Sequence, residues 1–233
     1  MKKSVSFLFF AIAFSFVSAA QNHLVDSLIS NAPAYNEYNR VRRDLFAHLP
    51  VTENNIVFFG DSITDRCEWD ELMENQSILN RGISGDRVVW MFDRYETVAK
   101  GHPAKLFTMC GVNDLNSGRT SADHTVAMIE ELLTRFHALS PGTEIYFQSI
   151  LPMNLDVPAR AKQRGTDINQ RISRCDLLLA EWCSQRDWVT YIDVASVLID
   201  SEGMLDAAYT VDGLHLNAAG YGAWKSLIFQ ICK

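Results

Sequence analysis

Four short blocks, far apart in the chain, carry residues that together could hydrolyse an ester. They are Gly-Asp-Ser-Ile at 60–63, Asn-Arg-Gly-Ile-Ser-Gly at 80–85, Gly-Val-Asn-Asp at 111–114 and Asp-Gly-Leu-His at 212–215. Nucleophilic acyl transfer uses a serine, a histidine that takes its proton and a carboxylate that orients the imidazole. Each block alone is a weak signal, but three of them follow a strand-like apolar run, and the combination is specific.

Ser62 and His215 are the candidate nucleophile and base. Ser62 follows a predicted strand and opens a helix, so we expect its hydroxyl at the sheet edge, near unpaired backbone N–H groups. Asp212 stands three residues before His215, and its carboxylate can hold one imidazole nitrogen while the other faces Ser62. The alternative is that these residues are helix caps and turn residues. The other histidines have no comparable carboxylate; they are His23, His48, His102, His124 and His137.

Two further residues offer donors for the oxyanion of such a reaction. Gly82 can bring its backbone N–H close to a substrate oxygen because no side chain intervenes. Asn113 can offer its side-chain amide, and the N–H of Ser62 would be the third donor. Gly82 and Asn113 taken singly would more often be ordinary turn residues, so this hypothesis depends on the blocks occurring together.

The composition is that of an ordinary globular chain and disfavours several partners. The 233 residues are 48% hydrophobic and 21% charged, which is enough for one well-buried core. A formal net charge of −7 disfavours nucleic acids and anionic membranes. The 5 cysteines are no disulfide framework, although one disulfide stays open. The sequence has no CxxC, HExxH, P-loop or GxGxxG pattern, and neither a metal nor another cofactor is expected.

Residues 1–20 have the pattern of a cleavable secretory signal. Two lysines precede an almost wholly apolar run at 4–17, and small residues at 18–20 follow. The run is short for a bilayer span, so an uncleaved anchor is the weaker alternative. The first cysteine is Cys67, which argues against a lipid-modified N-terminus. We therefore expect a secreted or periplasmic protein with no stable membrane insertion after signal cleavage.

Beyond the signal, strand-like and helix-like segments alternate. We expect strands at 54–59, 77–80, 105–110, 144–150 and 188–194, and helices at 23–49, 64–74, 86–100, 121–139, 160–187 and 217–231, with Asp86 and Asn217 as N-caps. Continuous apolar strands suit a parallel sheet that is buried on both faces. The sequence predicts an α/β fold, a three-layer α/β/α sandwich, as a single domain over 21–233 with an N-terminal helical extension at 21–50. Ser62, Gly82 and Asn113 fall just past strand ends, where such sheets bind ligands.

These blocks resemble those of the SGNH hydrolases, also called the GDSL esterase/lipase family. The four residues for which that family is named match Ser62, Gly82, Asn113 and His215. Asp212 matches the family's Asp-x-x-His carboxylate. The resemblance implies that Ser62, Asp212 and His215 are catalytic and that Ser62, Gly82 and Asn113 form the oxyanion hole.

The resemblance covers most of the chain, from Asn54 to Ile231. One departure is Ile63, which stands where the family has leucine, a conservative exchange. The stretches at 80–86 and 211–221 resemble the branch of platelet-activating-factor acetylhydrolase-like and carbohydrate acetylesterase-like proteins. The resemblance implies a flavodoxin-like sandwich with about five parallel strands, and hydrolysis of esters or thioesters without a metal or organic cofactor.

The sequence favours a serine esterase that acts on short acyl groups through an acyl-enzyme. An exported, acidic esterase is expected to act on soluble or cell-surface esters, and we favour O-acetyl groups carried by carbohydrates. Trp69 and Trp90 follow the first two blocks and could wall such a site, although burial in the core is the commoner fate of tryptophan. The expected partner is a small-molecule or glycan ester, and the oligomeric state stays open.

Three alternatives remain at this point. A lysophospholipase or thioesterase acting on longer acyl chains would need an elongated apolar groove. A non-catalytic carbohydrate-binding protein on the same scaffold would not need Ser62, Asp212 and His215 together. A flavin-binding protein of flavodoxin type would need a phosphate cradle rich in Ser, Thr and Gly, which the turn at 60–62 lacks.

Overall fold

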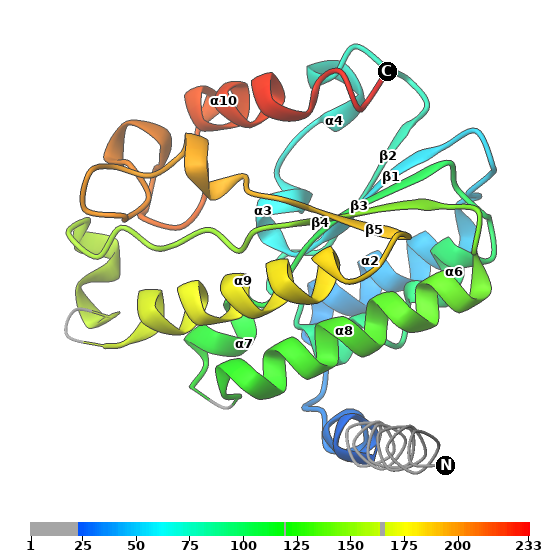
Figure 1. Ribbon diagram of the computed structural model, residues 1–233, viewed down its shortest axis with the longest axis horizontal. Coiled ribbons are helices and arrows are strands. Elements are labelled where there is room, and N and C mark those ends of the chain that lie inside the picture. Colours follow the sequence, from blue (N-terminus) through cyan, green and yellow to red (C-terminus); the bar gives the residue numbers. More distant parts are fainter. Residues whose placement is uncertain (1–22, 119, 164–165) are drawn as a thin grey trace, which may run out of the picture.

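Five parallel strands form one sheet at the centre of the molecule. The computed structural model describes residues 23–118, 120–163 and 166–233 (Figure 1). The strands are β1 (Ile56–Gly60), β2 (Ile78–Gly82), β3 (Lys105–Met109), β4 (Glu144–Gln148) and β5 (Val189–Ile192). They lie in the order β2-β1-β3-β4-β5, and each neighbouring pair is parallel. The five predicted strands and the parallel sheet are confirmed.

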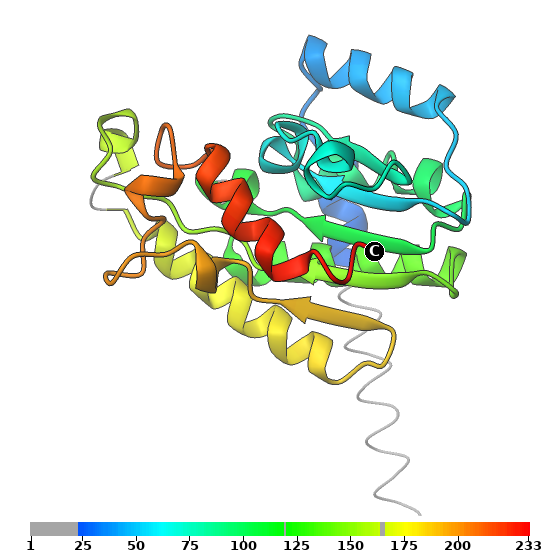
Figure 2. The ribbon, with the colours of Figure 1, turned by 90° about the horizontal axis from the view of Figure 1, so that it is seen from above.

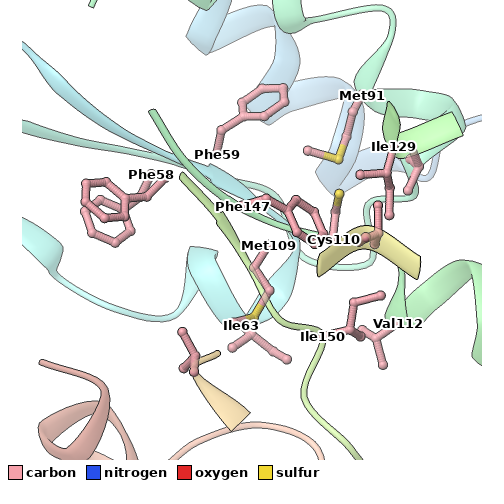
Figure 3. Packing of buried hydrophobic residues seen from close by; sticks show 14 of the residues in the cluster. Phe58, Phe59, Ile63, Met91, Met109, Cys110, Val112, Ile129, Phe147 and Ile150 are labelled. Atoms are coloured by element: carbon pink, nitrogen blue, oxygen red, sulfur yellow. The ribbon is translucent and has the colours of Figure 1, made fainter. Parts of the chain in front are cut away.

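The central part of the sheet is buried on both faces because β1 is apolar at successive positions. All five residues of β1 are buried. Phe58 and Phe59 follow each other in β1 and point to opposite sides of the sheet, as the pleat requires (Figure 3). Phe58 stacks on Trp69 with ring centroids 4.1 Å apart, and Phe59 lies under the guanidinium of Arg94 at 4.0 Å.

Helices cover both faces of the sheet. Besides a first helix at 23–30, the helices of the described residues are α2 (Glu37–His48), α3 (Ser62–Asp65), α4 (Trp69–Leu72), α5 (Val88–Met91), α6 (Tyr95–Ala99), α7 (Val112–Asn116), α8 (Ala122–Leu139), α9 (Ile168–Ser184) and α10 (Ala218–Ile228). Short 3-10 turns lie at Pro158–Gln163, Ala195–Val197 and Ala207–Tyr209. In Figure 1, α4 and α10 lie on one face and α6, α8 and α9 on the other. The predicted three-layer α/β/α sandwich is confirmed.

The N-terminal extension contains two helices instead of the single helix expected. The first covers 23–30, and residues 32–36 before α2 are not helical. Pro33 explains the break, because proline lacks an N–H donor and disfavours helical backbone at the residue before it. Asn36 then caps α2 by accepting a hydrogen bond from the N–H of Asn39 at 2.8 Å. Figure 2 shows α2, in blue, on the side of the molecule opposite α9 and β5.

Asp86 does not cap a helix, contrary to the expectation for 86–100. Its carboxylate pairs with Arg43 at 2.6 Å and with Arg94 at 2.7 Å. The segment forms two short helices, α5 and α6, and Arg94 lies between them. A buried ion pair with partners from other elements therefore replaces the local capping bond that the sequence pattern suggested.

Two further expected helices are shorter than predicted, and one cap is confirmed. The segment 64–74 is divided between α3 and α4. Within 160–187, the regular helix is α9, which follows a 3-10 turn. Asn217 caps α10 as predicted, since its side chain accepts a hydrogen bond from the N–H of Gly220 at 3.0 Å.

The predicted signal at 1–20 lies outside the described residues. In the described part of the chain, no helix combines the length and the apolarity that a membrane span requires. All five cysteines belong to the described part; each is buried and none forms a disulfide. Burial raises the pKa of Cys110 well above its ordinary value, and raises the pKa to about 12 at Cys67, Cys175, Cys183 and Cys232.

Candidate active site

The four sequence blocks meet at the carboxyl edge of the sheet. Ser62 opens α3 directly after β1, Gly82 is the last residue of β2, and Asn113 lies in α7 just past β3. Asp212 and His215 lie in the turn before α10. Because neighbouring parallel strands end at the same edge, the blocks become neighbours in space although they are far apart in sequence.

A continuous chain of hydrogen bonds joins Ser62, His215 and Asp212. His215 Nε2 lies 3.0 Å from Ser62 Oγ, and His215 Nδ1 lies 2.8 Å from Asp212 Oδ2. Both distances are within the reach that a nucleophile, its base and the orienting carboxylate need. Ser62 is buried, whereas His215 and Asp212 are half-buried. This geometry can move a proton from the serine hydroxyl to the imidazole.

Asp212 is held from several directions. Its Oδ1 accepts hydrogen bonds from the backbone N–H groups of Leu214 and His215, at 3.0 and 2.8 Å. Arg160 Nη2 donates to Oδ2 at 2.8 Å, and Arg160 Nε donates to the backbone oxygen of Asp212 at 2.9 Å. Burial alone would raise the pKa of Asp212, but hydrogen bonds from the backbone and imidazole of His215 outweigh it and hold that pKa well below its usual range. Asp212 is therefore an anion at neutral pH.

His215 has a lowered pKa. Burial lowers the pKa of its imidazole, the Asp212 carboxylate raises it, and the cations of Arg66 and Arg160 lower it again. The result is a pKa below the ordinary value of about 6.5. The imidazole is consequently neutral at neutral pH, which is the form that can accept the proton of Ser62.

Three N–H donors at the carboxyl edge of the sheet keep a hydrogen that no acceptor among the described residues takes: the backbone N–H groups of Ser62 and Gly85 and the side-chain amide of Asn113. Within the described part of the chain, the backbone N–H groups of Ser62 and Gly85 have no hydrogen-bond acceptor. Gly85 lies in a turn closed by a bond from the N–H of Asp86 to the oxygen of Ile83 at 3.0 Å, and its φ is 78°. Asn113 Nδ2 donates to the backbone oxygen of Asp86 at 2.9 Å, which leaves a second amide hydrogen available. Asn113 is thus next to Gly85.

The expected role of Gly82 does not fit this arrangement. Its N–H donates to the side-chain oxygen of Asn80 at 2.8 Å, so it is not free for a substrate oxygen. A Cβ at Gly82 would lie 2.3 Å from the backbone nitrogen of Asp65, in α3. Gly82 therefore permits the close approach of β2 and α3, whereas the N–H of Gly85 remains available to an acceptor. The turn glycine at 85 was visible in the same sequence block, but its positive φ was not.

Comparison with known proteins agrees with this geometry. Residues 58–223 match the GDSL-like Lipase/Acylhydrolase family. The chain belongs to this family. It is an acylhydrolase, and the match spans the serine block as well as the Asp212–His215 turn.

Three similar proteins illustrate the relationship of this acylhydrolase to others. The rat platelet-activating factor acetylhydrolase IB subunit alpha2 is 24% identical over 188 residues, covering 78% of this chain and 74% of the relative. A solved Streptococcus pneumonia structure described as a platelet activating factor has 26% identity and a TM-score of 0.72, covering 96% of this chain and 99% of the other. An acetyl-xylooligosaccharide esterase from Geobacillus has 18% identity and a TM-score of 0.59, covering 77% and 94%.

A groove of about 560 Å³ lies between the segment 66–72 and the start of α10, and Ser62, Asp212 and His215 are not among its lining residues. It is lined by Arg66, Cys67, Glu68, Glu71, Leu72, Leu216, Asn217, Ala218 and Tyr221. Leu216 directly follows His215, and the cation of Arg66 is close enough to lower the pKa of that histidine. Charged and apolar side chains both line the groove, so it offers both polar and apolar contacts.

The two tryptophans near the site are core residues. Trp69 is fully buried, and its indole N–H donates to the backbone oxygen of Thr64 at 2.8 Å. Trp90 is buried, and its indole N–H donates to the oxygen of Pro33 at 2.8 Å. Packing in the core, the commoner fate, therefore explains both residues.

Buried carboxyl groups lie directly beside the site residues. Asp61 precedes Ser62 and accepts the N–H of Ile63 at 3.0 Å; Asp114 follows Asn113 and accepts the N–H of Val88 at 3.1 Å. Burial raises the pKa of Asp61 and of Asp114 to about 7. Among the described residues, no three His, Cys, Asp or Glu side chains are grouped so that they could hold a metal ion.

Proposed function

We propose that this acylhydrolase removes short acyl groups, favouring O-acetyl esters of carbohydrates, through a covalent intermediate on Ser62. The observation that carries the proposal is the 3.0 Å separation between Ser62 Oγ and His215 Nε2, with Asp212 on the other imidazole nitrogen. A protein that only binds carbohydrate has no use for this hydrogen-bonded chain, and the proposal therefore includes catalysis by these three residues.

The first half of the reaction forms the acyl-enzyme. Ser62 Oγ attacks the ester carbonyl carbon while His215 Nε2 accepts the hydroxyl proton. Asp212 stabilises the imidazolium and keeps its Nδ1 hydrogen in place. The developing oxyanion accepts hydrogen bonds from the N–H groups of Ser62 and Gly85 and from the amide of Asn113. His215 then gives its proton to the leaving alcohol oxygen as the carbon–oxygen bond breaks.

The second half repeats the same steps with water. His215, neutral again, accepts a proton from a water molecule whose oxygen attacks the acyl carbon. The tetrahedral intermediate collapses, the bond to Ser62 Oγ breaks, and the serine recovers its proton from His215. The products are a carboxylic acid and a free enzyme. The lowered pKa of His215 favours this second step, because the imidazole must be neutral each time it acts as a base.

The groove lined by residues of 66–72 and 216–221 supports a polar alcohol half of the substrate. Arg66, Glu68 and Glu71 offer charged groups that hydroxyl groups of a sugar can bind, whereas a long acyl chain needs continuous apolar walls. The likeness to an acetyl-xylooligosaccharide esterase points the same way. Hydrolysis of long-chain lysophospholipids or thioesters is the competing function that the first experiment must separate.

Ser62→Ala tests the nucleophile. We expect p-nitrophenyl acetate and butyrate to be hydrolysed and the palmitate to be a poor substrate, because a long acyl chain needs continuous apolar walls and the groove carries charged side chains. Ser62→Ala should lose at least about 10⁴-fold in kcat, since losing the nucleophile leaves only residual catalysis from the rest of the site. Its thermal unfolding should stay close to that of the unchanged protein, because only one hydroxyl is removed.

The outcomes separate the two substrate classes. Activity confined to acetyl and butyryl esters, followed by acetate release from acetylated xylo-oligosaccharides, would support the proposal. A preference for palmitoyl esters would move the function to lysophospholipids or thioesters. Normal turnover by pure Ser62→Ala would exclude Ser62 as the nucleophile.

We also propose that the protein is exported, to the periplasm or outside the cell. The support is the basic start, the apolar run at 4–17 and the small residues at 18–20. Expression of the full chain in a bacterial host, followed by N-terminal sequencing of the released protein, tests this. Export with a first residue near 21 is the expected result, and an unprocessed cytoplasmic product would contradict it.

A further inference from the structure

We propose that the N-terminal helix α2 positions the oxyanion hole through the loop at 83–87, an inference that rests on the proposed esterase function. Helix α2 precedes the region 58–223 that matches the family, so this role belongs to the chain's own N-terminal extension. Two polar side chains of α2, Asn39 and Arg43, bond to the residues on either side of Gly85. We call residues 83–87 the oxyanion loop.

Asn39 holds the residue that precedes Gly85. Its Nδ2 donates to the backbone oxygen of Ser84 at 3.0 Å, and Asn39 is fully buried. The backbone N–H and the hydroxyl of Ser84 both donate to Asp65 Oδ2, at 3.1 and 2.6 Å. The same carboxylate oxygen accepts the Tyr38 hydroxyl at 2.7 Å. Helix α2 thus fixes Ser84 directly through Asn39 and indirectly through Tyr38.

Arg43 holds the residue that follows Gly85. Its Nη2 lies 2.6 Å from Asp86 Oδ1, and its Nη1 donates to the backbone oxygen of Trp90 at 2.8 Å. Asp86 is fully buried, and its other oxygen pairs with Arg94 at 2.7 Å. Without Arg43 the buried carboxylate of Asp86 would keep Arg94 as its single cation. Helix α5 would also lose the hydrogen bond that joins Trp90 to α2.

These bonds bear on two of the three proposed oxyanion donors. The N–H of Gly85 belongs to the peptide that links Ser84 to Gly85, and the amide of Asn113 is oriented by its bond to the oxygen of Asp86 at 2.9 Å. Oxyanion stabilisation depends on donors that are in place before charge develops. A misplacement of about 1 Å at such a site can cost about 10²-fold in rate, so bonds that fix this loop have a catalytic consequence.

Other residues of the N-terminal extension pack near the oxyanion loop as well. Arg43 stacks over the ring of Tyr35 at 4.2 Å, and the oxygen of Pro33 accepts the indole N–H of Trp90 at 2.8 Å. Trp90 is the residue whose backbone oxygen Arg43 binds. Figure 2 shows helix α2 at the periphery of the molecule. The bonds of Asn39 to Ser84 and of Arg43 to Asp86 join it to the oxyanion loop. The extension therefore supports the loop from outside the region 58–223 that matches the family.

The test compares Asn39→Ala and Arg43→Met with the control Arg40→Met, using p-nitrophenyl acetate and the full mature protein. Arg40 is exposed on the same helix, and among the described residues no hydrogen bond or ion pair joins it to the oxyanion loop. We expect kcat of Asn39→Ala and of Arg43→Met to fall about tenfold, with KM changed less than about twofold, because the loop positions transition-state donors. Arg40→Met should keep kcat and KM. Circular dichroism and thermal unfolding identify variants that do not fold.

A double-mutant cycle distinguishes positioning from a general structural role. Asn113→Ala alone should lower kcat by about 10²–10³. When Arg43→Met is added, its further cost should be clearly smaller than about tenfold, because the amide that it helps to position is already absent. A purely structural Arg43 would lower kcat by the same factor in both backgrounds, and that result would overturn the proposal. Arg43→Lys should restore only part of kcat, since an ammonium cannot bond both acceptors in the same fork geometry.

The other possible results of these experiments also support or overturn the role of α2. Where Arg43→Met does not fold, Asn39→Ala alone and combined with Asn113→Ala gives the same comparison. Full kcat in folded Asn39→Ala and Arg43→Met would exclude the role of α2. An unchanged protein that hydrolyses no ester in the series removes the esterase function itself, and the inference falls with it; activity in the unchanged protein separates the two failures.

Discussion

Arg160 ties the acidic member of the triad to a distant part of the chain. Its guanidinium bonds both the side chain and the backbone oxygen of Asp212, and its charge is one of the causes that lower the pKa of His215. We expect the acidic limb of kcat/KM for the unchanged protein to have its midpoint below pH of about 6.5, because only the neutral imidazole accepts the serine proton.

Arg160→Met should move that limb to higher pH. Removing the cation ends its direct effect on His215 and also leaves Asp212 a less compensated anion, and both changes raise the pKa of the imidazole. The measurement is kcat/KM for p-nitrophenyl acetate between pH 4 and 8, in steps of about half a unit. Lys162→Met, an exposed change on the same 3-10 turn, is the control. A limb that stays in place in Arg160→Met would contradict this account of the histidine.

Gly82 and Gly85 should respond differently to the same substitution. A Cβ at Gly82 would lie 2.3 Å from a backbone nitrogen, so Gly82→Ala must push β2 from α3 and should cost at least about 1–3 kcal/mol and much of kcat. A Cβ at Gly85 meets nothing within 4 Å, and the cost is that of a φ of 78°, about 1–2 kcal/mol. Urea unfolding and kcat of both variants check this. A Gly85→Ala protein that is less stable than Gly82→Ala would contradict the view that Gly82 is required for the packing of β2 against α3 and that Gly85 lies in open space.

Among the elements, the layer formed by α4 and α10 depends on Trp69. Its ring stacks on Phe58 of β1 and meets the ring of Trp224 of α10 edge-on, with centroids 4.8 Å apart. Trp69→Ala should lower the free energy of unfolding by about 3–5 kcal/mol, because it leaves a cavity between sheet and helix. Leu177→Ala, at a position 70% exposed on α9, should change it by less than about 0.5 kcal/mol. Equal losses in the two urea titrations would show that the Trp69 cluster is not a main support of the fold.

The elements also show which part of the structure local sequence can reveal. The strands were predictable because residues such as Ile56–Phe59 form an unbroken apolar run, a signal that lies entirely within each strand. The proximity of Ser62, Asp212 and His215 was predictable because Asp212 and His215 are three residues apart and Ser62 opens a helix directly after a strand. Their catalytic role stays a prediction. The ion pair between Asp86 and Arg43 was not predictable, because the two residues lie 43 positions apart and a local sequence pattern does not indicate contacts over that distance. The packing of Gly82 against Asp65 was hidden for the same reason, since Asp65 belongs to another element.

At the scale of the whole molecule, several buried carboxyl groups should make stability depend on pH. Burial raises the pKa of Asp61, Asp114 and Asp176 to about 7. A group whose pKa is raised on folding contributes stability that is fully present below its unfolded pKa of about 3.9, and that is lost as pH rises through the folded value. These groups therefore favour the folded state less at pH 8 than at pH 5.

The melting temperature should accordingly fall between pH 5 and pH 8. His215 acts in the opposite sense, because its lowered pKa removes stability as pH falls, but it is a single half-buried group against three carboxyls. Asp61→Asn keeps the acceptor for the N–H of Ile63 and removes one titration, so its melting temperature should fall less over the same range. Differential scanning fluorimetry in matched ionic strength measures both. A melting temperature that rises toward pH 8 would contradict the conclusion that the pKa values of these carboxyl groups are raised on folding.

The buried cysteines give the folded and unfolded chains opposite behaviour toward oxidants. Thiolates react and thiols do not, so five thiols that are buried and hard to deprotonate are inert while the fold lasts. Once the chain unfolds, all five become ordinary exposed thiols that can pair in many wrong ways. In an oxidising compartment, unfolding would then become irreversible through covalent cross-links, and the lifetime of this protein there would be set by how rarely it opens.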